Sequence, residues 1–387
     1  MAKLGEVCTI VSGSTPKTSV TSYWDGNIKW ITPAELNEDT FYIMDSVRHI
    51  TEEGKEKTGL SYLPTGTVIL SSRAPIGKTA IAGCEMCCNQ GFKNLICSDA
   101  IYNEYLYFFL KSKTDYLNSL GRGATFKEIS KSIVESIEIP LPEVNQQKEI
   151  AEKFKKLEQL ISLRKQQLAK LDELVKARFV EMFGDPADNV NNLPASPMTA
   201  ICQIIDGDRG KNYPKQEEFS DSGFCLFLNA KNVTAQGFSF ENCTYITEEK
   251  DTLLRNGKLC RGDVVLTTRG TIGNLAFYDT SVPYENIRIN SGMVILRMNK
   301  QVVSEIFFIE QFKMQLDSIK SRIASGSAQP QLPISTMNKI EMILPPIELQ
   351  KQFAAFVERV DQQKQTVQQS FEKLELMKKA LMQEYFG

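Results

Sequence analysis

Two long stretches of the chain carry apolar side chains at alternating steps of four and three residues, which is the spacing of a coiled-coil seam. The first seam comprises Ile150, Phe154, Leu157, Ile161, Leu168, Leu171 and Val175, and the second comprises Phe353, Val357, Val360, Val367, Phe371 and Leu374. The first helix would be about 50 Å long at roughly 1.5 Å per residue, too long to lie inside one domain. We therefore expect the two helices to pair as an antiparallel coiled coil. Arg164 and Lys364 interrupt the seams, where they either fix the register or extend out to solvent.

The segments before these helices contain short apolar runs bounded by glycine, proline and asparagine, as strands do. Residues 67–70, 264–266 and 293–296 are predicted strands, whereas residues 103–120 and 304–322 have the spacing of helices. Prolines at positions 140, 142, 345 and 346 end both segments, and proline suits the start of a following helix. Each segment is therefore expected to be a mixed α/β domain, so the predicted fold class is α+β.

The chain also repeats itself. Residues 63–78 match residues 259–274 at a constant offset of 196, with identical pairs Leu63/Leu259, Gly66/Gly262, Val68/Val264, Leu70/Leu266, Arg73/Arg269, Ile76/Ile272 and Gly77/Gly273. An offset of 203 relates the two helices, where Gln147, Lys148, Phe183 and Gly184 recur as Gln350, Lys351, Phe386 and Gly387. A repeat of about 200 residues is too long for a solenoid unit and indicates two homologous domains, each followed by a helix. The predicted boundaries are 1–145 for the first domain, 146–184 for its helix, 185–346 for the second domain and 347–387 for its helix.

Composition is that of a folded chain, which we expect to be cytoplasmic. The chain has 387 residues, 42% of them hydrophobic, without an apolar run of about 18 residues or the apolar core of a signal peptide at its start. Nine cysteines, an odd number without a framework spacing, are expected to be reduced thiols. The 45 basic and 47 acidic residues give a net charge of −2. A nucleic-acid-binding chain of this composition would have to gather its positive charge on one face.

A search for catalytic or metal-binding motifs identifies no site. Cys84, Cys87 and Cys88 form at most half of a zinc site, because no second Cys/His pair lies nearby. The single histidine of the chain lies near no recognisable nucleophile motif that would indicate a Ser-His-Asp or Cys-His arrangement. Lys78 lies in a sequence like the end of a phosphate-binding loop, but that loop requires glycine where Ser72 stands. We therefore predict a chain without a catalytic, metal or cofactor site of its own.

Several elements together resemble those of the specificity subunits of type I restriction-modification systems. They are the tandem plan of domain and helix, Trp30-Ile31-Thr32, the Leu-Ser/Thr-Ser/Thr-Arg-x-x-Ile-Gly element at residues 70–77 and 266–273, Met182-Phe183-Gly184-Asp185-Pro186, and the run Asp-Gly-Asp-Arg-Gly-Lys-Asn-Tyr at residues 206–213. The resemblance covers the whole chain. It implies that each domain is a target-recognition domain reading one half of a split double-stranded DNA target, and that the helices set the gap between the halves.

The same resemblance implies partners. Two methyltransferase subunits would dock on the helices, and motor-nuclease subunits would bind through the resulting complex. S-adenosylmethionine, ATP and Mg would be bound by those partner subunits, so this chain would be a non-catalytic component. No membrane partner is implied.

The repeat narrows the choice of DNA-contacting residues. Because Arg73 and Arg269 are identical in both halves, they cannot distinguish two half-sites and are better suited to phosphate contact or fold support. Specificity should lie where the halves differ, and Arg and Lys pair with guanine edges whereas Asn and Gln pair with adenine. The candidates are Arg209, Lys211, Asn212, Tyr213 and Asn274 in the second domain, and Lys17, Tyr23, Lys78, Gln90 and Lys93 in the first. For any one of these positions, an ordinary solvated loop residue is the alternative interpretation.

Two other classes of protein remain as alternatives. A non-catalytic scaffold that bridges proteins without recognising DNA could use the same coiled coil and the near-neutral charge. A self-contained DNA-modifying enzyme would need a cofactor loop or a metal cluster, which the sequence does not display. Trp24 and Trp30 are expected to serve in packing rather than in base stacking.

Overall fold

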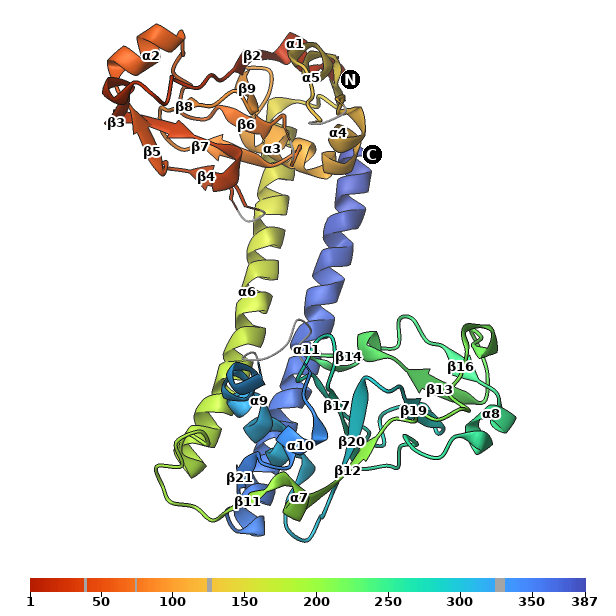
Figure 1. The fold of residues 1–387 in the computed structure, drawn as a ribbon. Coiled ribbons are helices and arrows are strands. Elements are labelled where there is room, and N and C mark those ends of the chain that lie inside the picture. The colour runs from red at the N-terminus through yellow and green to blue at the C-terminus, as the bar shows by residue number, and fades with distance from the viewer. Residues whose placement is uncertain (38–39, 74, 124–126, 324–330) are drawn as a thin grey trace. The chain divides into compact units, whose positions relative to one another are not determined.

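The computed structural model describes residues 1–37, 40–73, 75–123, 127–323 and 331–387, without the side chains of residues 322 and 323. The chain divides into two compact units, Met1–Lys165 with Gln368–Gly387, and Gln166–Val367. Each unit contains one mixed α/β domain and one segment of each of two long helices, α6 (Val144–Phe183) and α11 (Ile347–Phe386) (Figure 1).

In the first unit the start of α6 packs against the end of α11. The rings of Phe154 and Phe386 are stacked with their centroids 5.6 Å apart, and Lys378 forms an ion pair of 2.8 Å with Glu158. Later residues of α11 therefore meet earlier residues of α6, so the two segments are antiparallel. Arg164, one of the charged seam residues, donates a hydrogen bond of 3.2 Å to the Ser370 hydroxyl on the facing helix.

The second unit pairs the other two segments in the same antiparallel sense. Phe179 of α6 lies edge-on to Phe353 of α11 at 5.3 Å between centroids. Lys364, the second charged seam residue, forms an ion pair of 2.5 Å with Asp172 of the facing helix. Both charged seam residues thus reach across to the opposite helix of their own unit, and the predicted antiparallel coiled coil is confirmed.

The first domain is built on a sheet with the strand order β2-β9-β6-β7-β4 and a smaller sheet with the order β5-β3-β8. Their bounds are Cys8–Ser12 for β2, Phe92–Cys97 for β9, Val68–Ser71 for β6, Thr79–Ala82 for β7, Tyr42–Ile43 for β4, Arg48–Ile50 for β5, Trp24–Ile31 for β3 and Cys87–Cys88 for β8, while β1 (Ala2–Lys3) pairs with β10 (Glu138–Ile139). The helices are α1 (Leu4–Val7), α2 (Glu52–Thr58), α3 (Asn103–Ser112), α4 (Thr114–Leu120) and α5 (Lys131–Ser136).

One sequence expectation needs correction in this domain. The spacing over residues 103–120 predicts a single helix, but the structure breaks it into α3 and α4 at Lys113. The Ser112 hydroxyl donates to the Phe109 carbonyl and the Thr114 hydroxyl donates to the Lys111 carbonyl. Such side-chain bonds compete with the helical backbone pattern, which apolar periodicity does not register.

The second domain repeats this topology. Its four-stranded sheet has the order β12-β20-β17-β18, matching β2-β9-β6-β7, and its three-stranded sheet has the order β16-β13-β19, matching β5-β3-β8. The bounds are Cys202–Asp206 for β12, Met293–Met298 for β20, Asp263–Thr267 for β17, Leu275–Phe277 for β18, Tyr245–Ile246 for β16, Cys225–Leu228 for β13, Ile287–Ile289 for β19, Val233–Thr234 for β14, Gly237–Phe238 for β15, Ala195–Pro197 for β11 and Glu341–Ile343 for β21. The helices are α7 (Met198–Ile201), α8 (Glu248–Leu253), α9 (Glu305–Ile323) and α10 (Ile334–Met337).

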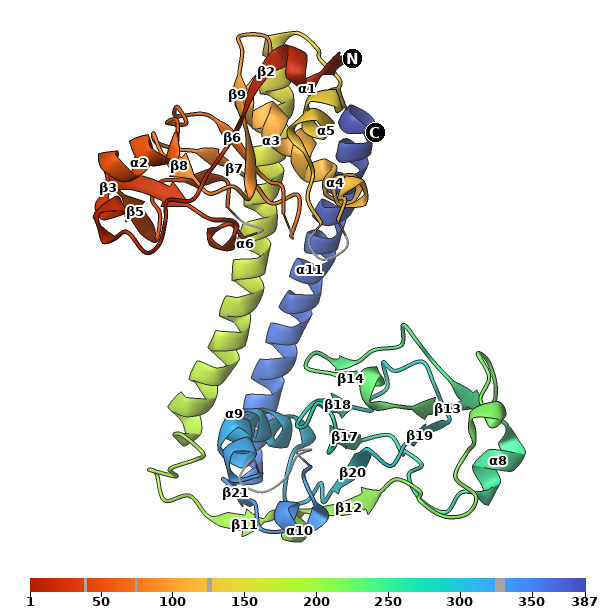
Figure 2. The ribbon, with the colours of Figure 1, turned by 45° about the horizontal axis from the view of Figure 1, so that its top comes forward.

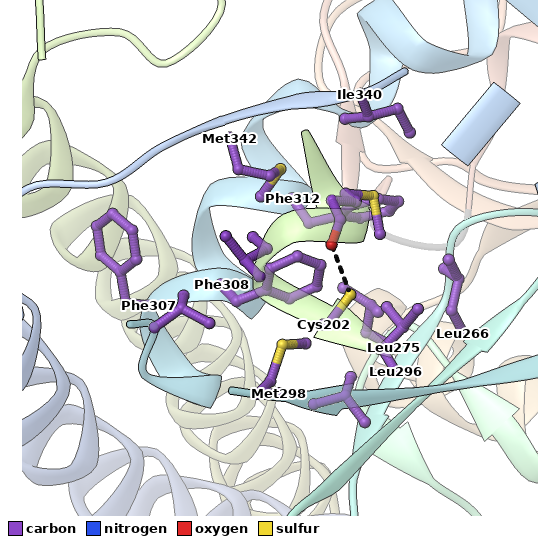
Figure 3. Packing of buried hydrophobic residues seen from close by; sticks show 14 of the residues in the cluster. Cys202, Leu266, Leu275, Leu296, Met298, Phe307, Phe308, Phe312, Ile340 and Met342 are labelled. Carbon is purple, nitrogen blue, oxygen red and sulfur yellow. Dashed lines mark hydrogen bonds between the residues drawn. The ribbon is translucent and has the colours of Figure 1, made fainter. Parts of the chain in front are cut away.

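Helix α9 lies beside α11 in the second unit (Figure 2). Its aromatic side chains fill the core of that unit (Figure 3). Phe308 and Phe312 belong to one buried cluster with Leu266, Leu296 and Met298 from the four-stranded sheet. On the other side of α9, Phe307 stacks on a phenylalanine of α6 at 5.3 Å between centroids. Full burial of such a side chain contributes about 1.5–3 kcal/mol, so α9 joins the sheet of this unit to its helix pair.

Candidate nucleic-acid interface

In the first domain, three loops meet at one edge of the larger sheet. Because Ser12 lies opposite Lys93 and Ser71 lies opposite Phe92, the chain leaves β2, enters β9 and leaves β6 at the same edge. We call residues 13–17, 72–73 and 89–91 the first loop edge. It includes the candidates Lys17, Arg73 and Gln90.

The second domain places its equivalent loops at the equivalent edge. Asp206 lies opposite Val294, and Thr267 lies opposite Met293, so the ends of β12 and β17 adjoin the start of β20. We call residues 207–213, 268–270 and 290–292 the second loop edge. It includes the candidates Arg209, Lys211, Asn212, Tyr213 and Arg269.

Two buried tryptophans hold the loop that carries Lys17. The indole N–H of Trp30 donates to the Ser14 carbonyl at 3.0 Å, and that of Trp24 donates to the Lys17 carbonyl at 3.2 Å. The guanidinium of Arg48 lies 3.5 Å from the ring centroid of Trp24. The tryptophans are therefore packing residues, as expected from the sequence, and they leave the Lys17 side chain exposed.

Gln90 lies beside this loop, whereas Tyr23 is occupied elsewhere. The Thr15 hydroxyl donates to Oε1 of Gln90, so the exposed Gln90 side chain joins the Lys17 loop. Tyr23 is half-buried and packs partly against the cluster that contains Trp24. The structure therefore brings Gln90 and Lys17 into one loop edge and leaves Tyr23 in a smaller core.

Arg73 and Lys93 share one carboxylate. Nε of Arg73 lies 3.0 Å from one oxygen of Glu128, and Nζ of Lys93 lies 3.2 Å from the other. Burial alone raises the pKa of the Glu128 carboxyl, but hydrogen bonds from Lys93 and Arg73 outweigh it and hold the pKa below its usual value. Glu128 is therefore a carboxylate at neutral pH.

Two predicted DNA contacts have their amines occupied inside the domain. Lys93 is buried, and besides Glu128 its amine lies 3.4 Å from the Ser72 hydroxyl. Lys78 is half-buried and donates to the carbonyls of Pro33 and Leu36 at 3.2 and 2.6 Å. Sequence reasoning could not separate these lysines from surface lysines, because their partners lie far along the chain.

The second loop edge exposes Arg209 and Lys211. The guanidinium of Arg209 donates to the Ser291 carbonyl at 3.2 Å and pairs with Asp206 at 3.1 Å, yet half of its side chain remains accessible. Lys211 is exposed, with no side-chain hydrogen bond or ion pair to the described part of the chain. Asn212 donates to the Leu253 carbonyl at 3.1 Å, and Tyr213 packs edge-on against a phenylalanine of β13.

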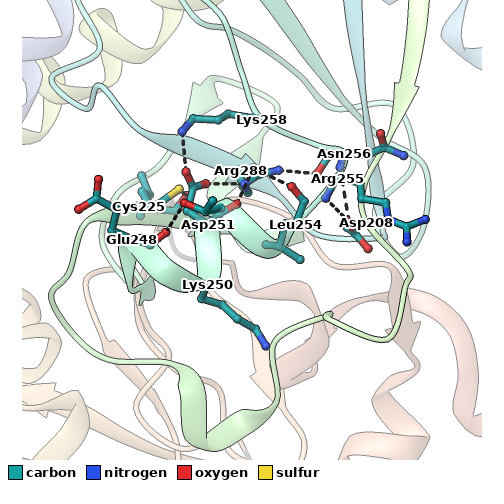
Figure 4. A network of polar contacts seen from close by, with 12 residues as sticks. Asp208, Cys225, Glu248, Lys250, Asp251, Leu254, Arg255, Asn256, Lys258 and Arg288 are labelled. Atoms are coloured by element: carbon teal, nitrogen blue, oxygen red, sulfur yellow. Dashed lines mark hydrogen bonds and ion pairs between the residues drawn. The ribbon is translucent and has the colours of Figure 1, made fainter.

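A buried carboxylate missed by sequence reasoning shapes this loop. Asp208 accepts backbone N–H bonds from Gly210 and Arg255 at 2.7 Å and from Asn256 at 3.4 Å (Figure 4). Burial raises the pKa of its carboxyl, but the three backbone bonds prevail and lower it. A polar Asp-Gly-Asp run in a predicted loop was the available signal, but its backbone partners were not foreseeable.

Behind this loop lies a buried ion pair. Arg288 donates to Asp251 at 2.5 Å, to the Asn256 carbonyl at 2.8 Å and to the Leu254 carbonyl at 3.2 Å, while Lys258 reaches the other oxygen of Asp251 at 2.6 Å (Figure 4). The segment that binds Asp208 is therefore itself fixed by Arg288.

The two repeated arginines have different environments. Whereas Arg73 is held by Glu128, the exposed side chain of Arg269 has no hydrogen bond or ion pair within the described ranges. Its backbone N–H donates to the Gly292 carbonyl at 3.2 Å. Asn274 is less accessible than Arg269. It is half-buried, and its side-chain amide donates to the Val233 carbonyl at 2.9 Å.

Two of the three clustered cysteines, Cys87 and Cys88, are buried. Burial raises the pKa of Cys87 to about 11 and that of Cys88 to about 12, so both are neutral thiols. Among the residues that the structure describes, no group of three or more His, Cys, Asp and Glu side chains is arranged to hold a metal ion. No helix in the described ranges combines the length and apolar character needed to cross a membrane.

Comparison with known sequences identifies relatives along the chain. A family described as the type I restriction modification DNA specificity domain matches residues 1–173 and 198–376. The type I restriction enzyme MjaIX specificity subunit of Methanocaldococcus jannaschii is 29% identical over 389 aligned positions, which cover 92% of this chain and 85% of that protein.

Two solved structures share the fold. All of this chain aligns with 95% of the type I restriction-modification system S subunit from M. genitalium, at 17% identity and a TM-score of 0.57. It also aligns with 96% of a chain from a study of complex assembly and conformational transition of the type I R-M system, at 16% identity and a TM-score of 0.61. At these identities the likeness concerns the fold.

Proposed function

The chain belongs to the family of type I restriction-modification DNA specificity proteins, and on this premise we propose that it is the specificity subunit of such a system. Each mixed domain reads one half of a split double-stranded DNA target, and the helices set the spacing between the halves. The observation that carries this proposal is the pair of loop edges. Two homologous sheets present the same arginine, Arg73 or Arg269, beside loops of different sequence.

The loop edges suggest a division of labour among the candidate residues. Arg269 and Lys211, exposed and without internal partners in the described chain, suit phosphate contact. Arg209 and Gln90, exposed but oriented by neighbouring backbone or hydroxyl groups, suit contact with base edges. Lys17 is exposed on the loop held by the tryptophans and suits either role.

The other candidates act indirectly in this proposal. Lys78, Lys93, Asn212 and Asn274 support the loop edges through the hydrogen bonds described above, and Tyr23 and Tyr213 support them by packing. Arg73 is shared between Glu128 and a phosphate.

The long helices are proposed to dock two methyltransferase subunits, through which motor-nuclease subunits join. Exposed apolar side chains on α6 and α11 support this assignment. In the first unit, Leu163 and Leu376 are 51% and 68% exposed. In the second unit, a groove of about 1090 Å³ is lined in part by Leu174, Ala355 and Phe356 of α6 and α11. Helices that present such residues suit further helices as partners.

Chemistry is assigned to the partners in this proposal. S-adenosylmethionine, ATP and Mg bind to the methyltransferase and motor-nuclease subunits, and this chain contributes recognition without catalysis in the cytoplasm. Its own residues position DNA, so its loss would abolish targeting rather than the transfer chemistry.

Genome-wide mapping of methylated adenine tests the proposal. A host expressing the chain with its methyltransferase partner is compared with the same host lacking the chain. A split motif that depends on the chain is the expected result, and it reveals both half-sites. An active methyltransferase complex without any such motif would instead favour a scaffold that bridges proteins without reading DNA.

A further inference from the structure

Glu128 and Gln331 occupy equivalent positions in the two domains. Each forms an antiparallel bridge with the repeated arginine of its domain, Glu128 with Arg73 and Gln331 with Arg269. The following residue donates to the residue before that arginine in both cases: Ile129 to the Ser72 carbonyl at 3.0 Å, and Leu332 to the Thr268 carbonyl at 2.9 Å. The offset of 203 between Glu128 and Gln331 is also the offset between the two long helices.

These equivalent residues have nearly the same shape but different hydrogen-bonding chemistry. A glutamate side chain only accepts hydrogen bonds, whereas a glutamine side chain both donates and accepts. Both side chains reach solvent: that of Glu128 is 35% exposed, and that of Gln331 is exposed with no hydrogen bond to the described part of the chain. A difference of this kind, beside an identical arginine, can discriminate between half-sites.

The Glu128 carboxylate is fixed before any ligand arrives. Its backbone N–H and carbonyl bond to the Arg122 carbonyl and N–H at 2.9 and 3.0 Å, and its two oxygens each bind one cation, Arg73 or Lys93. A carboxylate offers about four acceptor positions, so about two remain. Because two cations surround one anion, the cluster is net positive and compatible with approach to DNA.

We propose that Glu128 and Gln331 are specificity-determining residues, each selecting a base in the half-site read by its own domain. This inference rests on the proposed function. The Glu128 carboxylate accepts a hydrogen bond from the amino group of cytosine, whereas the Gln331 amide pairs with the amino group and ring nitrogen of adenine.

The base assignments follow from the edges that bases present in the major groove. Guanine shows two acceptors, and thymine shows one acceptor and a methyl group. The acceptors repel a carboxylate, and the methyl group cannot donate a hydrogen bond to it. Adenine shows a donor beside an acceptor, which matches an amide better than a carboxylate. Cytosine shows a donor, so it suits Glu128.

Reciprocal substitutions in the full chain, assembled with its methyltransferase partner, test the proposal. The methylation motif and the affinity for DNAs with single-base changes are measured for Glu128→Gln and for Gln331→Glu. We expect Glu128→Gln to reduce the preference for cytosine at one position of one half-site by roughly tenfold or more, and Gln331→Glu to do so for adenine in the other half-site. Glu53→Gln, an exposed substitution on α2, is the matched control and should leave the motif unchanged.

Three results would overturn the inference. They are an unchanged motif in both variants, a loss of affinity that is equal for all bases, and a wild-type motif without cytosine in the half-site affected by Glu128→Gln. In each case a motif still depends on the chain, so the proposed function stands. If Glu128→Gln prevents assembly by releasing Arg73, Gln331→Glu decides the question, since the Gln331 side chain makes no hydrogen bond to the described part of the chain. A wild-type complex that directs no motif would remove both proposals.

Discussion

Gln147 and Gln350 make the same three hydrogen bonds in the two halves of the molecule. Oε1 of Gln147 accepts from the Tyr102 N–H, and its Nε2 donates to the carbonyls of Ala100 and Pro142. Oε1 of Gln350 accepts from the Ser304 N–H, and its Nε2 donates to the carbonyls of Val302 and Pro345. Both side chains are fully buried. Each glutamine therefore joins the first turn of a long helix to the start of the helix that packs on its sheet.

Replacing either glutamine should destabilise the fold. Gln147→Leu or Gln350→Leu leaves one N–H and two carbonyls without partners, and we expect the free energy of unfolding to fall by roughly 1–3 kcal/mol. Denaturant titration of the purified chain measures the change. Gln146→Leu, at an exposed neighbouring position, should change stability by less than about 0.5 kcal/mol. Equal effects for Gln146→Leu and Gln147→Leu would contradict the role assigned to the buried bonds.

Stability of the second domain should depend more on the buried Arg288 of the ion pair than on the more exposed Lys258. Arg288→Met removes the buried cation of the pair and leaves the more exposed Lys258 to balance the buried Asp251 carboxylate; removal of one partner of a buried pair costs about 3–5 kcal/mol. Lys258→Met removes a more exposed cation and should cost less than about 1 kcal/mol. Thermal unfolding of both variants provides the comparison, and similar losses would refute the ranking.

Lys211 provides a direct test of phosphate contact. Lys211→Ala should weaken DNA binding, and the slope of log affinity against log salt concentration should fall in magnitude by about 1, because one fewer counterion is released. Binding is measured at several salt concentrations. Lys313→Ala, on α9 and paired with Glu310, serves as the control. An affinity unchanged by Lys211→Ala would remove this residue from the interface.

Asp208 should make the second domain sensitive to acid. Because its folded pKa is lowered, its contribution is present above the unfolded pKa of about 3.9 and is lost as pH falls through the folded pKa. Asp208→Asn should therefore be less stable than the natural chain by about 1–2 kcal/mol at neutral pH, with the difference shrinking below about pH 4. Denaturant unfolding of both chains at a series of pH values from about 3 to about 7 measures this difference in stability. A difference independent of pH would show that the charge of Asp208 is irrelevant.

Periodicity and repetition were sufficient to predict the architecture. Seam residues such as Phe154 and Val360 are buried, because a coiled coil requires apolar side chains at that spacing and little else. The offset of 196 correctly identified β6 and β17 as equivalent strands of the two domains, since identical turns impose identical strand ends. The break at Lys113 was missed, because hydroxyl bonds to backbone carbonyls leave no apolar signature.

The candidate interface was only partly predictable. Exposed Arg209 and Lys211 lie in a loop that the sequence marks by its basic, glycine-flanked composition. Lys93 has the same residue type as Lys211, but a carboxylate 35 positions away in the chain, Glu128, draws it inward. Contacts between residues so distant in sequence depend on the sheet register, which composition does not encode.

Residues Gln368–Gly387 complete the core of the first unit, which constrains the order of folding during synthesis. Phe386 contacts Tyr105, Phe109 and Phe154, yet it is translated after all of Gln166–Val367, the entire second unit. At roughly 5–20 residues per second, the ribosome needs about 10–40 s to produce that intervening stretch. The second unit is therefore contiguous in the nascent chain, whereas the first unit lacks its Phe386 contacts until that residue has been synthesised. A ribosome that stalls before Phe386 releases a first unit without the aromatic side chain that completes its core.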